Sequence, residues 1–597
     1  MAREQLLSPM PGVVIEIQVS AQAAIRKGQS LFVVEAMKME NTIISKFDGI
    51  VQQVLVQKGD VIRKGQPLLS YQKAAPQAIA VVEESKQDLD DIRPDLQALR
   101  DRKKFLLDEA RPKAVAKRAA KGQQTARQNL ALLCDSDTFR EYGALAVAAQ
   151  RNRRSEEDLI ENTPADGLVC GMASVNRELF DNQAQNCAVM AYDYTVLAGT
   201  QGMYNHYKMD RLLGVAGKKK LPIILFAEGG GGRPGDVDVQ TVAGLHIMTF
   251  YEFAKLDGIV PRISIVSGYC FAGNAALAGA SDIIIATKNT NIGMGGPAMV
   301  EGGGLGQFHP KEIGPAAIQE ANGVIDVLVE DEIAAIKAAK HYLSYFQGRL
   351  VAWEAADQRY LRQLIPLNRK RVFDIREVVE TLADVDSVFE LGQRTAKSMF
   401  TALIRIEGHP VGLIANNAKY DAGAITSEGA AKAVRLMKLC QNFGIPFLSL
   451  VDTPGIMVGP EAEKTGTVKE AAELFKVGAK LTVPTFAVVL RRAYGLGAMA
   501  MTGGSFHAPD FIISWPSGEF GAMGLEGAIK LGYRKELEAI ADPLERKAVY
   551  EDMLAKAYER GRATSIAAYL EIDEVIDPLD TRAWIVTGLQ DKRGISS

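Results

Sequence analysis

Apolar and polar residues alternate in short stretches along the start of the chain, and glycines separate the stretches. The segment "GVVIEIQV", which begins at Gly12, is echoed by "GIVQQVLV", which begins at Gly49, and "IRKGQ" at 25–29 recurs at 62–66. Both echoes have the same offset of 37 residues. A period of two predicts half-buried β-strands, and a repeated set of strands predicts two similar halves. We therefore expect a small pseudo-symmetric β barrel or sandwich.

The segment that joins these halves, "LFVVEAMKMENTIIS" at 31–45, places Lys38 between Met37 and Met39. A core strand would exclude the lysine, and a solvent-facing turn would exclude the methionines. Because the segment connects two sets of strands, we expect Lys38 on an exposed hairpin. Its ammonium would lie in water while the methionines fix the local shape.

Beyond Tyr71 the pattern changes to charged sequence with helical spacing. The stretch 74–93, which contains proline and alanine, predicts a linker. A basic cluster follows, formed by Lys113, Lys117, Arg118 and Lys121. Interleaved acids and the lack of aromatic residues argue against a nucleic-acid patch. The cluster is either a solvated helix face or a contact for an anionic ligand such as the phosphates of coenzyme A.

The rest of the chain alternates apolar runs with helical segments, which predicts βαβ units. Buried strands are expected at 221–228, 261–268, 282–288, 445–452, 483–490 and 510–515. These segments repeat: "LPIILFAEGGGGR" corresponds to "IPFLSLVDTPGIM", each an apolar strand ending in an acid and a glycine-containing turn. We therefore divide the chain into a β domain, the linker and two copies of one α/β domain, at 1–73, 74–93, 94–370 and 371–597.

Composition narrows the function classes. A chain of 597 residues exceeds what one hydrophobic core serves, and its net charge of −3 gives no case for nucleic acid. No apolar run is long enough for a membrane span. The five cysteines lie far apart, which favours a reducing, cytoplasmic location. Neither they nor the six histidines show metal-site spacing, and no Walker A or nucleophile-elbow motif is present. We expect no metal and no ATP site.

Two junctions between a turn and a helix, at 271–274 and 495–498, consist mostly of small residues. Small residues let a backbone approach a ligand closely, and a helix N-terminus offers free N–H donors that suit an oxyanion or enolate. Ordinary tight packing explains most single junctions of this kind. The same feature at corresponding places in two copies favours a function.

The motif "EAMKMEN", with "SPMPG" upstream and "DGIV" downstream, resembles the biotin carboxyl carrier domain. The resemblance implies that a biotin protein ligase attaches biotin to Lys38. Attached biotin would give the lysine a long tether that travels between active sites. A lipoyl domain shares the fold, but its lysine usually stands in a "DKA" setting, which is absent here.

The segments "TPADGLVCGMASVN", "FAEGGGGRPGD" and "RRAYGLGAMAM…WPSGEFGAMGLEGA" resemble the carboxyltransferase component of acyl-CoA carboxylases, a likeness that covers 94–597. That family has two crotonase-like domains, of the ββα-superhelix type, and usually forms a hexamer, a trimer of dimers. The expected fold is therefore an all-β biotinyl domain followed by two α/β crotonase-like domains.

The resemblance also implies site residues. One pair of backbone oxyanion donors falls on Ala272 and Gly273, and the other on Leu496 and Gly497, where the family more often has Gly and Ala. Further residues are implied at Lys208 and Arg233, near coenzyme A or as structural ion-pair partners, and at Met499, which would help to choose the acyl group or simply pack its helix.

The expected activity is transfer of a carboxyl group from carboxylated biotin on Lys38 to the α-carbon of an acyl-CoA, of the acetyl or propionyl type, with longer chains left open. A biotin carboxylase is required, either as a separate subunit or as an upstream part of a larger polypeptide. Two alternatives remain: a biotin-dependent decarboxylase that runs the transfer in reverse, and a non-catalytic biotin carrier or scaffold.

Overall fold

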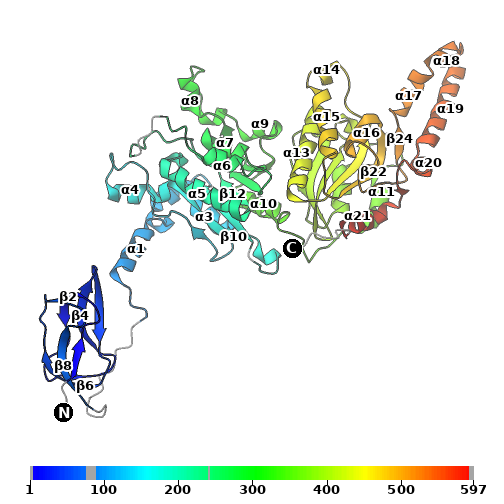
Figure 1. Cartoon of the computed structure of the whole chain (residues 1–597). Helices are drawn as coiled ribbons and strands as arrows, with labels where there is room; N and C mark the ends of the chain where they lie inside the picture. The colour runs from blue at the N-terminus through cyan, green and yellow to red at the C-terminus, as the bar shows by residue number, and fades with distance from the viewer. Residues whose placement is uncertain (1–3, 75–88, 184, 239–242, 591–597) are drawn as a thin grey trace. The chain divides into compact units, whose positions relative to one another are not determined.

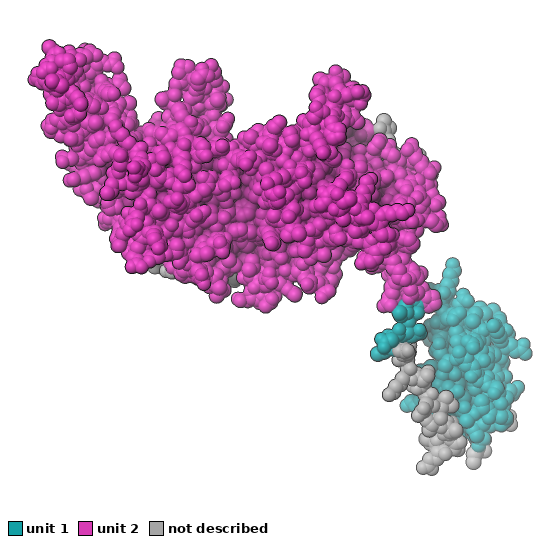
Figure 2. All heavy atoms as spheres, turned by 180° about the vertical axis from the view of Figure 1, so that it is seen from behind, with its two compact units in different colours: residues 1–93 teal, residues 94–597 magenta. Residues whose placement is uncertain are grey.

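The computed structural model describes residues 4–74, 89–183, 185–238 and 243–590. The chain divides into two compact units, residues 1–93 and 94–597, which Figure 2 shows in different colours. No helix in the described ranges is long and apolar enough to cross a membrane.

The first unit is all β, as expected. Its strands are β1 (Glu4–Leu7), β2 (Gly12–Ile17), β3 (Ala24–Ile25), β4 (Ser30–Ala36), β5 (Met39–Ile44), β6 (Gly49–Val54), β7 (Val61–Ile62) and β8 (Pro67–Lys73). Within the described residues they form two sheets of four strands, in the orders β1-β8-β6-β3 and β5-β4-β2-β7. Apolar side chains such as Val14, Phe32 and Leu69 are fully buried in the core of this unit.

The repeat of 37 residues appears directly in this fold, because β2, β3 and β4 recur as β6, β7 and β8. Gly12 and Gly49 show why each half begins with glycine. A Cβ at Gly12 would lie 2.5 Å from the carbonyl oxygen of Glu35, and one at Gly49 would lie 2.7 Å from that of Gln72. The predicted pseudo-symmetry is confirmed.

The second unit contains two sheets of related topology (Figure 1). Among its described residues, the first sheet has seven strands in the order β17-β15-β13-β12-β11-β10-β9. Only the β9–β10–β11 end is antiparallel, and the other neighbours are parallel. The strands are β9 (Arg140–Glu141), β10 (Leu168–Ser174), β11 (Asn186–Tyr192), β12 (Ile223–Phe226), β13 (Arg262–Val266), β15 (Ile283–Thr287) and β17 (Val327–Val329); β14 (Tyr269–Phe271) and β16 (Asn291–Gly293) pair separately.

The second sheet repeats this plan. In the described part of the chain it has eight strands, of which β18-β19-β20-β21-β22-β23-β25 lie in order and β24 pairs with β22. It too begins antiparallel and continues parallel. Its strands are β18 (Phe389–Glu390), β19 (Met399–Ile406), β20 (His409–Asn416), β21 (Phe447–Thr453), β22 (Thr485–Tyr494), β23 (Phe511–Ser514), β24 (Glu519–Gly521) and β25 (Glu574–Val575).

Helices accompany both sheets. Those of the first half are α1 (Pro94–Lys104), α2 (Pro112–Ala119), α3 (Ala126–Leu133), α4 (Glu156–Asn162), α5 (Met203–Lys219), α6 (Thr249–Ala254), α7 (Gly273–Gly279), α8 (Pro297–Gly302), α9 (Ala316–Ala321) and α10 (Glu332–Ser344). Those of the second half are α11 (Leu361–Leu364), α12 (Ile375–Leu382), α13 (Ser427–Phe443), α14 (Pro460–Glu463), α15 (Thr467–Gly478), α16 (Gly495–Met501), α17 (Leu525–Gly532), α18 (Arg534–Ala539), α19 (Pro543–Gly561), α20 (Ala563–Ala568) and α21 (Thr581–Gln590).

Each of the six strands expected from apolar runs is present within one to four residues of its expected bounds. One continuous hydrophobic core contains buried residues from both sheets, such as Ile285 and Leu403. Leu361 lies before the expected domain boundary at 370, yet it packs in the core of the second sheet. The position of that boundary stays a prediction. Most of the expected linker, 75–88, lies outside the described residues.

Candidate functional site

Lys38 lies at the tip of the hairpin formed by β4 and β5. The ladder continues as far as the pair Ala36–Met39, which leaves Met37 and Lys38 as the two turn residues. Both have positive φ, 53° and 65°, the backbone signature of a two-residue type I′ turn. The expected exposed hairpin is therefore present, and it presents the lysine amine to solvent.

The two methionines do not hold this turn by packing. Met37 is 98% exposed and Met39 is 69% exposed. The expectation that they fix the local shape was wrong, because the ladder beneath them sets the turn. Such exposed apolar side chains leave a solvent-facing apolar surface on both sides of the lysine.

The two sheets of the second unit build one junction twice. In the first copy, Phe271 at the end of β14 pairs with Gly293, and the chain enters α7. In the second copy, Tyr494 at the end of β22 pairs with Gly521, and the chain enters α16. The pairing residues occupy equal positions before the two helices, so the copies can be aligned residue by residue.

The next residue turns the chain in both copies. Ala272 has φ 50° and Gly495 has φ 57°, a region that glycine adopts freely and alanine adopts only under strain. Counting on from there, Gly273 corresponds to Leu496, and Gly497 is one residue further along. The two pairs of donors expected from the sequence are thus out of register by one residue.

Ala272 itself is not available as a donor. Its N–H donates to the carbonyl oxygen of Gly293 at 3.0 Å, which extends the pairing of β14 with β16. The predicted role of this residue as an oxyanion donor is corrected accordingly. The N–H of Gly273, in the first turn of α7, has no acceptor within its helix, and the residue is half-buried.

A loop that follows the neighbouring strand lies against each helix start. After β12, Gly231 accepts from Gln201 N–H at 2.7 Å, and Arg233 N–H donates to Gln201 at 2.9 Å. After β21, Gly455 accepts from Ile425 N–H at 3.0 Å, and Met457 N–H donates to Ile425 at 2.9 Å. The residues between these anchors correspond to each other as well.

Those intervening residues are Gly232 and Ile456. Neither of their N–H groups has an acceptor among the described residues. The helix start is close in both copies. A Cβ at Gly231 would lie 3.3 Å from Gly273 N, and a Cβ at Gly497 would lie 2.8 Å from Ile456 N and 2.5 Å from the Gly455 Cα. Glycine is therefore required where the loop touches the helix.

Each copy thus offers two kinds of free donor, one from a helix start and one from a loop. The sequence predicted the helix donors Gly273, Leu496 and Gly497 but missed the loop donors. The glycine run at 229–232 was the available signal, and it supported the family resemblance without being assigned a donor. The Leu496 side chain is 63% exposed.

Lys208 is a structural lysine. It is 8% exposed, and its ammonium donates to the carbonyl oxygens of Ala165, at 2.7 Å, and Leu168. Burial lowers its pKa. The ammonium is directed at the backbone and the stem is buried, which favours a structural role for Lys208. The expected place near coenzyme A stays a prediction.

Arg233 is a structural ion-pair partner. Its side chain is 3% exposed and pairs with Asp166, which is fully buried, and with Asp236 at 3.5 Å. The guanidinium also donates to the carbonyl oxygen of Thr200 at 2.9 Å. Of the two roles left open by the sequence, the structure supports this one.

The basic cluster splits in the structure. Lys113, Lys117 and Lys121 are exposed, as a solvated helix face requires, whereas Arg118 is buried. Met499, on α16, is 37% exposed. No group of acids, histidines and cysteines within the described ranges could hold a metal ion.

Two family models match the chain. Residues 117–592 match the family described as carboxyl transferase domain. The chain belongs to the carboxyl transferase family. Residues 4–70 match a second family, described as biotin-requiring enzyme. Both resemblances seen in the sequence are confirmed.

Relatives of this carboxyl transferase cover most of its length. The methylmalonyl-CoA carboxyltransferase 12S subunit of Propionibacterium freudenreichii subsp. shermanii is 30% identical over 485 residues, 80% of this chain and 90% of that protein. The propionyl-CoA carboxylase carboxyltransferase subunit of Haloferax mediterranei is 29% identical over 510 residues, 82% of this chain and 95% of that protein.

Two solved structures resemble the chain. One, a single-chain, multi-domain long-chain acyl-CoA carboxylase, is 49% identical with a TM-score of 0.80; the match covers 98% of this chain but only 56% of that longer one. The other, the transcarboxylase 12S hexamer with methylmalonyl-CoA and methylmalonic acid bound, is 28% identical with a TM-score of 0.74, covering 86% of this chain and 98% of that one. The fold is a biotinyl domain followed by crotonase-like carboxyltransferase domains.

Proposed function

We propose that this carboxyl transferase moves a carboxyl group between biotin held on Lys38 and the α-carbon of an acyl-CoA thioester. The duplicated pairing of a glycine-containing loop with a helix start carries the proposal. The reaction needs two oxygens to be stabilised, that of the thioester enolate and that of the biotin ureido group. The fold offers two equivalent sets of backbone donors.

The donors of the first copy are the N–H groups of Gly273 and Gly232. Those of the second copy are the N–H groups of Leu496 and Ile456, with Gly497 next in the helix. Backbone donors fixed by secondary structure need no reorganisation when negative charge develops on an oxygen, which is why they stabilise a transition state well. Which set faces the thioester is left to experiment.

The exposed hairpin supports Lys38 as the attachment residue. Its amine is accessible to a biotin protein ligase, and the ladder of β4 and β5 holds it away from the core of its unit. When bound, biotin supplies a ureido nitrogen that carries the carboxyl group. The lysine stem lengthens the reach of this group, and the chain's donors orient the oxygens on either side of the transfer.

The partners follow from the chemistry. Carboxylation of biotin by bicarbonate requires ATP, and neither the motifs of this chain nor its matched families supply an ATP site. We therefore propose a biotin carboxylase, as a separate subunit or as part of a longer polypeptide. A hexamer is proposed by analogy with the 12S relative, and a cytoplasmic location from the dispersed cysteines.

The substrate is proposed to be an acyl-CoA whose chain length stays open. The sequence favoured acetyl or propionyl groups, whereas the relative that is 49% identical is described as a long-chain enzyme. A panel of CoA esters from acetyl to palmitoyl, incubated with the biotinylated chain, a biotin carboxylase, ATP and labelled bicarbonate, decides between them. Label in an acid-stable CoA product is expected for at least one ester. Label confined to biotin with every ester would refute the transfer.

A further inference from the structure

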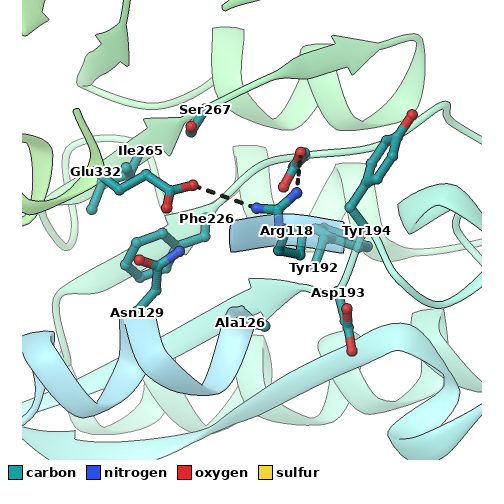
Figure 3. Close-up of a pocket in the computed structure, with 11 residues that line it drawn as sticks. Arg118, Ala126, Asn129, Tyr192, Asp193, Tyr194, Phe226, Ile265, Ser267 and Glu332 are labelled. Atoms are coloured by element: carbon teal, nitrogen blue, oxygen red, sulfur yellow. Dashed lines mark hydrogen bonds and ion pairs between the residues drawn. The ribbon is translucent and has the colours of Figure 1, made fainter. Parts of the chain in front are cut away.

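The proposed function leaves one buried acid unexplained, Glu228, which lies two residues beyond the end of β12. Glu228 directly precedes the glycine loop and is 8% exposed. Its carboxylate pairs with Arg118 at 2.7 Å, although Arg118 lies far away in the sequence, on α2. The same guanidinium reaches Glu332 of α10 at 3.4 Å. Figure 3 shows Arg118 with Glu332 on one side of it. These residues line a cavity of about 20 Å³.

The carboxylate lies between the loop and the strand that leads into α7. A Cβ at Gly268, just before β14, would lie 2.6 Å from Glu228 Oε1, so only glycine leaves room for the carboxylate there. The Glu228 backbone is fixed as well. Its carbonyl oxygen accepts from Asn274 Nδ2 at 3.2 Å, and Asn274 Oδ1 accepts from Gly231 N–H at 3.3 Å. Asn274 thus ties α7 to both ends of the loop.

The second copy makes the same connection with different residues. Asp452, fully buried at the end of β21, pairs with Arg491 at 2.7 Å and with Arg492 at 2.8 Å. Both arginines lie on β22, which runs directly into α16. In register, Arg491 of the second copy corresponds to Gly268 of the first. The first copy therefore lacks its own arginine at this place, and Arg118 supplies one from α2.

We propose that Glu228, held by Arg118, is a positioning residue that fixes the glycine loop against the start of α7 and so aims the Gly232 N–H at the reacting oxygen. This inference rests on the proposed function, and it assigns the role to a residue pair that does not touch the substrate. A buried acid paired with arginine precedes the loop in both copies, which supports this role. The two copies use arginines from different places in the sequence, so the pair recurs although the arginine positions do not.

The ionisation of Glu228 makes the proposed positioning role depend on pH, whereas a role in packing alone would not depend on pH. Burial raises its pKa to about 7, against the opposing effect of Arg118. The ion pair is therefore present above about pH 7 and is lost below it. The groups that face this carboxyl from the surrounding elements are Arg118, Glu332, Asp193, Tyr194 and Cys270.

The test compares Glu228→Gln with a matched control, Glu332→Gln, in the full-length biotinylated chain. Both remove one buried acid from Arg118, but Glu332 lies on α10, away from the glycine loop. Transfer to biotin is followed from pH 6 to 8 with α-carboxylated CoA esters from malonyl-CoA to a long-chain analogue. We expect Glu228→Gln to lower kcat about tenfold with KM unchanged and to remove the rise of kcat with pH that wild type shows near pH 7. Glu332→Gln should keep both the wild-type kcat and that rise.

Wild-type kcat and pH dependence in Glu228→Gln, or equal losses in both variants, would overturn the positioning role. An inactive wild type would instead refute the proposed function. Should Glu228→Gln fail to fold, Arg118→Met replaces it, since methionine keeps an unbranched apolar stem but removes the charge that holds Glu228. A folded Arg118→Met variant with wild-type kcat would overturn the inference equally.

Discussion

Replacement of Leu496 by proline removes one proposed oxyanion donor and little else. Leu496 is the second residue of α16 and is 63% exposed. Its N–H has no acceptor within the helix, because the first turn of any helix leaves its N–H groups free. Proline is tolerated in this turn for the same reason, and Gly495 before it has a flexible backbone. The substitution therefore deletes a donor without breaking a helical hydrogen bond.

The expected loss can be stated in advance. Removing one donor from an oxyanion site lowers kcat by roughly 10²–10³, or about 3–4 kcal/mol of transition-state stabilisation. Leu496→Ala is the matched variant, since it removes the same exposed side chain but keeps the N–H. The assay is initial-rate transfer of labelled carboxyl to free biotin from an α-carboxylated CoA ester on which the wild type is active, with circular dichroism to confirm folding. We expect Leu496→Pro to be at least about 100-fold slower than Leu496→Ala. Equal rates in two folded variants would refute the assignment of this N–H.

Three further predictions concern other parts of the chain. Lys38→Arg keeps the charge at the hairpin tip but abolishes biotin incorporation, as a streptavidin blot will show; a biotinylated variant would place the attachment elsewhere. Gly497→Ala puts a Cβ 2.5 Å from the Gly455 Cα and should destabilise the fold by about 1–3 kcal/mol, whereas Gly532→Ala, which meets nothing within 4 Å, should not; urea unfolding compares them. Burial lowers the pKa values of His206 and His341 to about 4, so the unfolded chain binds these protons first and stability falls as the pH drops from 6.5 to 4. Each histidine should contribute a loss of up to about 3 kcal/mol, and a urea midpoint that stays constant over this range would contradict it.

The first unit was the part most fully predictable from the sequence. Its strands obey a period of two, its halves repeat at a fixed offset, and Lys38 interrupts the pattern where a turn must be. The methionines beside the lysine were misjudged because residue type alone does not tell whether a turn needs packing. A ladder that runs up to the turn residues makes such packing unnecessary.

The two α/β copies were predictable as a pair, since apolar runs and glycine turns recur in order. The register between the copies was not. The register depends on Ala272, whose N–H donates to the carbonyl oxygen of Gly293 and is therefore not free. These two residues are far apart in the sequence, so only the folded sheet shows that they are hydrogen-bonded. The donors Gly232 and Ile456 were missed for a related reason. Each lies between two residues that are hydrogen-bonded to a neighbouring segment, and this backbone arrangement, not the residue type, is what the two share.

Buried charge was the least predictable feature. Lys208 and Arg233 lie in segments that resemble a ligand site, yet Lys208 donates to backbone carbonyl groups and Arg233 pairs with Asp166 inside the fold. Arg118 was grouped with exposed lysines by its spacing, whereas it fills a place that the second copy gives to Arg491. Sequence separation hides such pairs, because each partner is an ordinary surface residue type until the fold brings them together.

The central claim is that this chain itself transfers a carboxyl group between biotin and an acyl-CoA. The most direct measurement incubates the purified chain with free biotin and a series of α-carboxylated CoA esters, from malonyl-CoA and methylmalonyl-CoA to a long-chain analogue. Each ester is labelled in the carboxyl group, and neither ATP nor any partner is present. The account predicts enzyme-dependent, saturable loss of label from the CoA ester with matching formation of the decarboxylated ester and labelled carboxybiotin. A folded, biotinylated chain that transfers no label from any ester of this series would contradict the account and leave it a carrier without catalysis.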